Sequence, residues 1–139
     1  MNVELLLFFV LILGFGGVVL WFIATKAQGS RTFNQDKYRS EWLAIDKQLV
    51  KDNEASYHLS ILNADKLLDR ALKEAGYKGT TMGDRMKSAK DIWSNANHVW
   101  TAHKLRNQIA HETNVKVSYD TTRRALVAFK QALKDVGAI

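Results

Sequence analysis

The chain has 139 residues, which suffice for one small domain with an appendage, and it contains neither cysteine nor proline. The lack of cysteine excludes disulfides and thiolate metal sites, and the lack of proline favours long, uninterrupted helices. A formal net charge of +6 suits a polyanionic partner, such as nucleic acid or an anionic membrane surface.

The N-terminal stretch LLLFFVLILGFGGVVLWFI, residues 5–23, is apolar and carries no charge. At about 1.5 Å per residue, its length as a helix matches the hydrocarbon core of a bilayer. A cleaved signal peptide would need a basic start and a small-x-small cleavage site, whereas this chain begins MNVE. We therefore predict an uncleaved transmembrane anchor in residues 1–26.

The charged residues that flank this span predict its orientation. Only an acid, Glu4, precedes the span, whereas four basic residues follow it: Lys26, Arg31, Lys37 and Arg39. By the positive-inside rule, we expect a single-pass protein of the cell membrane whose C-terminal domain lies in the cytoplasm. The same basic residues would be attracted to anionic lipid headgroups.

After the span we expect a polar linker, residues 27–34, and then a helical domain, residues 35–139. Apolar residues spaced by three and four predict helices over about residues 36–51, 54–75 and 92–111. Gly76 is a typical helix terminator, the stretch Thr81-Met82-Gly83-Asp84 matches a capping box for a short helix, and Ser118 can cap a final helix. Strand signals are nearly absent. The predicted fold class is therefore all-α: a bundle of four to five helices preceded by one N-terminal transmembrane helix.

The stretch HKLRNQIAHE, residues 103–112, concentrates polar side chains on the predicted fourth helix of the domain. A helical wheel separates two faces that are not expected to meet water. The first, expected in the core, contains His98, Ala102, Leu105 and Ile109. The second, expected to meet a partner or line a cleft, contains Ala96, Val99, Trp100, His103, Arg106, Asn107 and Ala110. Thr101, Lys104 and Gln108 are expected to face water.

Two acids on the second predicted helix of the domain are expected to behave differently. Asp65 lies on the apolar stripe, so a buried carboxylate there would need a partner, for which His103 and Arg106 are candidates. The alternative is an edge position with the carboxylate in water. Asp69, flanked by Lys66 and Lys73, is expected to form ordinary solvated ion pairs.

The run from Arg106 to His111 matches the R-x4–6-H motif of the HEPN superfamily, with a polar residue after the arginine. The longer string AHKLRNQIAHE resembles the motif helix of bacterial HEPN-like proteins, and the preceding segment ADKLLDRALKEAGYKGTTMGDRMK also resembles that group. The resemblance covers about residues 36–136. It implies a HEPN-like helical bundle that forms a homodimer, with two copies of the motif facing one cleft, and that cleaves RNA without a metal ion.

The resemblance also implies roles for single residues. His111 would be the general acid and base, Arg106 would clamp the phosphate, and Asn107 would hydrogen-bond the phosphate or orient the histidine. Supporting or substrate-binding positions are predicted at His103, Asp65 and Glu112. The spacing places Arg106 and His111 about 140° apart on an ideal helix. They would therefore meet only through a second protomer or an unwound helix end.

A non-catalytic role is the main alternative. His111 could be a helix-end residue stabilised by the helix dipole, and Arg106 could be only the structural partner of Asp65. The chain would then be a HEPN-like dimerisation module that binds RNA, a nucleotide or a protein. No H-x3-H or H-E-x-x-H spacing occurs, so neither a metal site nor a cofactor is predicted. HEPN-like domains often act in defence or toxin–antitoxin systems, so an antitoxin is a further possible partner.

Overall fold

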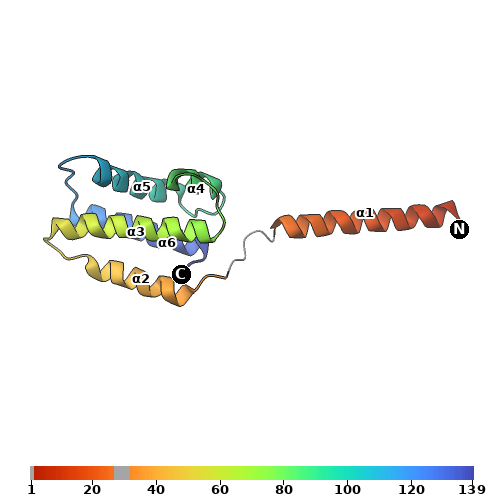
Figure 1. Ribbon diagram of the computed structural model, residues 1–139, viewed down its shortest axis with the longest axis horizontal. Coiled ribbons are helices and arrows are strands. Elements are labelled where there is room, and N and C mark those ends of the chain that lie inside the picture. The colour runs from red at the N-terminus through yellow and green to blue at the C-terminus, as the bar shows by residue number, and fades with distance from the viewer. Residues whose placement is uncertain (1, 27–31) are drawn as a thin grey trace. The chain divides into compact units, whose positions relative to one another are not determined.

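The computed structural model describes residues 2–26 and 32–139, and it divides the chain into two compact units, residues 1–31 and 32–139. Within the described residues there are six α-helices and no strand (Figure 1). The all-α fold class and the N-terminal apolar helix are thus confirmed.

The N-terminal unit contains one helix, α1 (Val3–Lys26). Its apolar part, Val3–Ile23, is 21 residues long, and its large apolar side chains are exposed instead of packed in a core. Such a helix is long and apolar enough to cross a membrane. Most of the predicted linker, residues 27–31, lies outside the described residues.

The C-terminal unit begins with α2 (Gln35–Gln48) and α3 (Glu54–Glu74). The side chain of Asn34 caps α2, and that of Asn53 caps α3, each by accepting a hydrogen bond from a backbone N–H in the first turn. The prediction that the first helix continues to residue 51 is wrong. The backbone becomes extended at Leu49, and Asp52 adopts a positive φ of 65°.

The loop between α2 and α3 is held by side chains of α3. The Ser56 hydroxyl accepts a hydrogen bond from the Val50 N–H, and the Tyr57 hydroxyl accepts one from the Asp52 N–H. These bonds satisfy backbone groups that a longer α2 would have bonded within the helix.

The predicted termini of the second and third helices of the unit are confirmed. Gly76, just after α3, has a positive φ of 89°, which suits glycine. The short helix α4 (Met82–Ser88) starts with a complete capping box, in which Thr81 and Asp84 each bond the backbone of the other.

The last two helices are α5 (Ala96–His111) and α6 (Tyr119–Val136). Ser118 caps α6 as predicted, and Gly137 ends it in the left-handed region. The predicted start of the fourth helix at residue 92 is wrong, because Asn95 is the N-cap and α5 starts after it. Trp93 lies in the preceding loop and donates its Nε1–H to the Met86 carbonyl.

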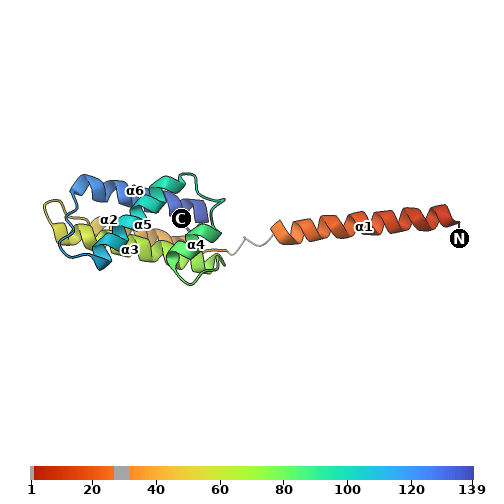
Figure 2. The same cartoon turned by 90° about the horizontal axis from the view of Figure 1, so that it is seen from above.

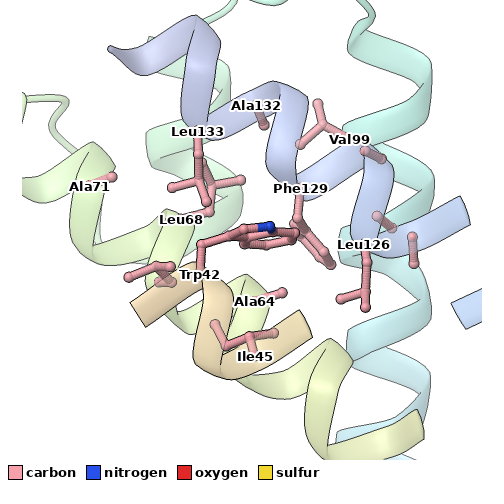
Figure 3. Packing of buried hydrophobic residues seen from close by; sticks show 14 of the residues in the cluster. Trp42, Ile45, Ala64, Leu68, Ala71, Val99, Leu126, Phe129, Ala132 and Leu133 are labelled. Atoms are coloured by element: carbon pink, nitrogen blue, oxygen red, sulfur yellow. The ribbon is translucent and has the colours of Figure 1, made fainter. Parts of the chain in front are cut away.

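Helix α3 lies at the centre of the C-terminal unit and packs against α2, α4, α5 and α6 (Figures 1 and 2). The core joins residues from all five helices, and every core residue lies between 33 and 139. In Figure 3, Trp42 of α2 points toward Phe129 of α6. Leu68 of α3 and Leu133 of α6 belong to the same buried cluster. The unit therefore has a hydrophobic core of its own, which leaves the outer side of α3, α4 and α5 for polar groups.

Candidate functional site

An open cleft of about 1220 Å³ lies between α3, α4 and α5. Five of the six predicted site residues line it: Asp65, His103, Arg106, Asn107 and His111. The sixth, Glu112, lies at a different depression with Glu54 and His58. Four residues of the α5 face that was expected to meet a partner or line a cleft therefore line a cleft within one protomer: Trp100, His103, Arg106 and Asn107.

The floor of the cleft contains a buried pair, Asp65 of α3 and His103 of α5, whose residues are 2% and 7% exposed. Asp65 Oδ1 lies 2.8 Å from His103 Nδ1, and Asp65 Oδ2 lies 3.2 Å from Arg106 Nε. The prediction that a buried Asp65 would be partnered by His103 or Arg106 is confirmed, and both residues contact its carboxylate. The alternative of an edge carboxylate in water is wrong.

Asn107 closes these contacts into a ring of four side chains. Its Oδ1 accepts a hydrogen bond from Arg106 Nη1 at 3.0 Å, and its Nδ2 lies 3.3 Å from His103 Nε2. We call Asp65, His103, Asn107 and Arg106 the polar ring. Each of its four sides is a hydrogen bond or an ion pair, so it orients every member by two neighbours.

The polar ring also assigns the tautomer of His103. Because Asn107 presents its carbonyl oxygen to Arg106, its amide nitrogen faces His103 and can only donate. His103 Nε2 must then accept, and Nδ1 must carry the proton donated to Asp65. Both ring nitrogens of His103 are thus used within the protein.

Arg106 is the member of the polar ring with donors to spare. A guanidinium has five N–H groups, and the ring contacts involve only Nε and Nη1. Its side chain is 34% exposed and lines the cleft. The ring therefore holds Arg106 in one orientation while its Nη2 remains available to a ligand.

Three lysines line the same cleft as Arg106: Lys66 on α3, Lys87 on α4 and Lys104 on α5. All three are exposed, and in the described parts of the chain none of them forms an ion pair. Of the three acids of the cleft, Asp65 is paired with Arg106 and Asp69 with Arg85. Asp84 accepts a backbone hydrogen bond in its capping box and is the one acid of the cleft without an ion pair among the described residues. The cleft therefore offers unpaired positive charge to an anionic ligand.

Asp69, which lines the cleft and is partly exposed, is held by an ion pair with the buried Arg85. Arg85 is 7% exposed, and its Nε and Nη2 donate to the two carboxylate oxygens of Asp69 at 2.7 and 3.1 Å. Its Nη1 donates to the Gly79 carbonyl at 2.7 Å. This bidentate contact joins α3, α4 and the loop between them.

Asp69 was expected to be a solvated residue, and this is wrong. Its ion pair with Lys73 does form, but its main partner is buried Arg85, and its side chain is only 19% exposed. Burial acts to raise the pKa of Asp69, but the hydrogen bonds and charges of Arg85 and Lys73 outweigh burial and hold this pKa below its ordinary value. The Asp69 carboxylate is therefore stabilised by its surroundings.

Trp100 forms part of the cleft wall. Its ring meets the His103 ring edge-on, with 6.1 Å between the ring centroids. The indole also lies beside Gly83 of α4, where an added Cβ would be 3.9 Å from two indole carbons. Trp100 thus connects α5 to α4 beside the polar ring.

The predicted faces of α5 need correction at four residues, of which Ala96 and Ala110 are exposed and do not line the cleft. Val99 is buried at 2% exposure and belongs to the core, whereas His98 is exposed. The reason is that α5 packs against both α3 and α6, so its buried arc is broad and is centred on Val99, Ala102 and His103. Leu105 and Ile109 are partly buried against the core.

His111 and Arg106 line the same cleft, although their spacing separates them on a helical wheel. His111 is the last residue of α5 and is exposed, and the helix does not unwind before it. A single protomer therefore brings both motif residues to one cleft.

Lys87 and Asn97 line the cleft but were not predicted from the sequence, and Lys104 was expected to face water. The role of Arg85 as the partner of the cleft residue Asp69 was not predicted either. Lys66 and Lys104 each follow a polar-ring residue directly, which is the one local signal for them. For Arg85 the sequence offers no such signal, because its partner Asp69 is 16 residues away.

Among the described residues, no three His, Cys, Asp or Glu side chains come together in a way that could hold a metal ion. Comparisons of the chain with protein-family models, with curated proteins and with solved structures find no match.

Proposed function

We propose that the chain is a membrane-anchored, HEPN-like ribonuclease that binds RNA in the cleft between α3, α4 and α5 and cleaves it without a metal ion. One observation carries the proposal: Arg106, Asn107 and His111 line one cleft with three unpaired lysines, and the polar ring fixes Arg106 there. Positive charge binds the RNA backbone irrespective of sequence, and a fixed guanidinium matches phosphate oxygens.

The chemistry requires one base, one acid and one cation. His111 takes the proton of an RNA 2′-hydroxyl as its oxygen attacks the adjacent phosphorus, and Arg106 stabilises the charge of the phosphorane. The bond from phosphorus to the 5′-oxygen then breaks, and this oxygen takes a proton from an acid. The products are a 2′,3′-cyclic phosphate and a 5′-hydroxyl end. His111 of a second copy of the chain would supply that acid in a homodimer.

The anchor would restrict the reaction to the surface of the cell membrane. The basic residues that follow the apolar span favour a cytoplasmic C-terminal unit, which is the side on which RNA is abundant. A protein that blocks the cleft, such as an antitoxin, would control the activity.

Cleavage is tested with the full chain in detergent micelles, mixed RNA and excess EDTA. We expect the wild-type protein to cleave RNA. The cleavage rate should fall about 100- to 1000-fold in Arg106→Ala and about 100- to 10,000-fold in His111→Ala. His98→Ala is the matched control, because His98 is exposed on the same helix but does not line the cleft. No cleavage by wild type, or equal cleavage by all four proteins, would sink the enzyme assignment.

Dimerisation is a separate test, for which a fragment of residues 30–139 is suitable because the core lies within residues 33–139. Light scattering should give twice the mass of the fragment. A monomer at every concentration that still cleaves RNA would contradict the two-copy mechanism.

A non-catalytic RNA-binding module is the second candidate. It is favoured by the polar ring itself, since Arg106 already has protein partners without any ligand. Filter binding separates the two: RNA that is bound and recovered intact, with equal yields for wild type and His111→Ala, supports binding alone.

A further inference from the structure

A path of contacts leads from the buried Asp65–His103 pair through Asn107 to the partly exposed side chain of Arg106. We propose that His103 is a positioning residue, which acts through Asn107 to hold Arg106 ready for an RNA phosphate. This positioning role rests on the proposed function, because Arg106 is the residue proposed there to bind the RNA phosphate.

His103 has no free nitrogen with which to transfer a proton. Nδ1–H is donated to Asp65 at 2.8 Å, and Nε2 accepts from Asn107. At 7% exposure the ring is also poorly accessible to a ligand. His103 therefore makes its hydrogen bonds to other protein side chains, whereas His111 is exposed in the cleft.

Each contact in this path orients the next one. Asp65 fixes the tautomer of His103, and the Nε2 lone pair then fixes the amide group of Asn107 with its nitrogen inward. This leaves the amide oxygen to accept from Arg106 Nη1 at 3.0 Å. If the amide turned over, two donors would face each other at Arg106 and the contact would be lost.

The path matters for a ligand because arginine is otherwise mobile. Ordering a long, partly exposed side chain at the moment of binding costs conformational entropy, and a guanidinium held beforehand avoids this cost. His103 thus affects RNA without touching it. Its removal should weaken RNA binding only when Arg106 is present.

Two variants separate the role of the hydrogen bonds from that of the ring volume. In His103→Gln, the side-chain amide offers a donating NH2 group and an accepting carbonyl oxygen, so it can still donate and accept as the neutral imidazole does. In His103→Leu, an apolar side chain occupies the space and neither bond forms. The measurement is fluorescence anisotropy of a labelled, single-stranded 2′-O-methyl RNA, which cannot be cleaved by its own 2′-oxygen, with the full chain in detergent micelles and EDTA.

We expect His103→Leu to weaken the Kd about tenfold or more, which is the effect of losing one hydrogen bond to a charged group. His103→Gln should stay within about threefold of wild type. In an Arg106→Ala background, the change to His103→Leu should have no further effect, because the residue it positions is gone.

Three results would overturn the positioning role while RNA binding by wild type stands. These are an unchanged Kd for His103→Leu, an equal loss for His103→Gln, and the same loss in the Arg106→Ala background. If wild type binds no RNA, the proposed function fails, and the positioning role fails with it. Circular dichroism checks the folding of each variant. Should His103→Leu not fold, Asn107→Ala replaces it, with the same expected loss and the same dependence on Arg106.

Discussion

The carboxylate of Asp65 and the imidazole of His103 form a buried hydrogen bond of 2.8 Å that joins the middle of α3 to the middle of α5. A buried carboxylate without partners would strongly oppose folding. The hydrogen bond with His103 and the ion pair with Arg106 offset the free-energy cost of burying Asp65. Both contacts can form only when α5 packs on α3 in one register. The pair therefore selects the arrangement that also builds the cleft.

Asp65→Ala should lower the free energy of unfolding of the 30–139 fragment by about 1–3 kcal/mol, because the buried Nδ1–H of His103 loses its acceptor and Arg106 loses its ion pair. Urea unfolding at pH 7 measures this. Asp65→Asn keeps the shape and one acceptor, so it should cost less. A loss below about 0.5 kcal/mol for Asp65→Ala is typical of a surface substitution. Such a result would contradict a stabilising role for the buried Asp65 carboxylate.

Asp69 should make stability depend on pH. Its folded pKa lies below the ordinary value of 3.8, so its contribution is fully present above 3.8 and is lost as the pH falls through the folded pKa. Compared with Asp69→Asn, wild type should be about 1.5–3 kcal/mol more stable at pH 7, and this difference should shrink below pH 3.8. Urea unfolding of both proteins at several pH values gives the difference. A difference that stays constant down to the lowest pH would exclude the ion pair with Arg85 as its source.

Gly79→Ala should destabilise the C-terminal unit by about 1–3 kcal/mol. A Cβ at this position would lie 2.6 Å from the Arg85 backbone nitrogen and 2.7 Å from Asp84 Cβ, so the loop that Arg85 binds would have to move. Gly83→Ala is the matched control. There the nearest atom is 3.8 Å away, and alanine is the better helix former, so its Tm should be unchanged or higher. Equal changes in Tm for both variants would show that the close approach at Gly79 is relaxed in solution.

The orientation in the membrane can be read from single cysteines, because the chain has none of its own. In intact cells, a membrane-impermeant maleimide should label Asn2→Cys and should label Ser40→Cys only after permeabilisation. The full chain should remain in the membrane pellet after alkaline carbonate, whereas residues 30–139 should be released. Labelling of Ser40→Cys in intact cells would reverse the proposed topology and place the cleft away from cytoplasmic RNA.

Local chemistry made much of the fold predictable. The capping box of Thr81 and Asp84, the Ser118 cap and the terminator Gly76 each act over three or four residues, so their partners are visible in the sequence. The ends that were misjudged, at residues 48 and 96, depend on what the neighbouring loop touches. The Val50 N–H donates a hydrogen bond to the Ser56 hydroxyl, and the Trp93 Nε1–H donates one to the Met86 carbonyl. Neither residue belongs to the helix that was predicted to include it.

By itself, the sequence determined that there is an apolar N-terminal helix, that the rest is helical, and that a buried Asp65 would need a cation or donor from elsewhere. Only the tertiary structure decided which residues meet it. Asp65 and His103 are 38 residues apart, and Asp69 and Arg85 are 16 apart, so these contacts depend on how helices pack and not on spacing along one helix. Packing also placed His111 and Arg106 in one cleft. A wheel gives directions around one axis, whereas a cleft is bounded by several helices at once.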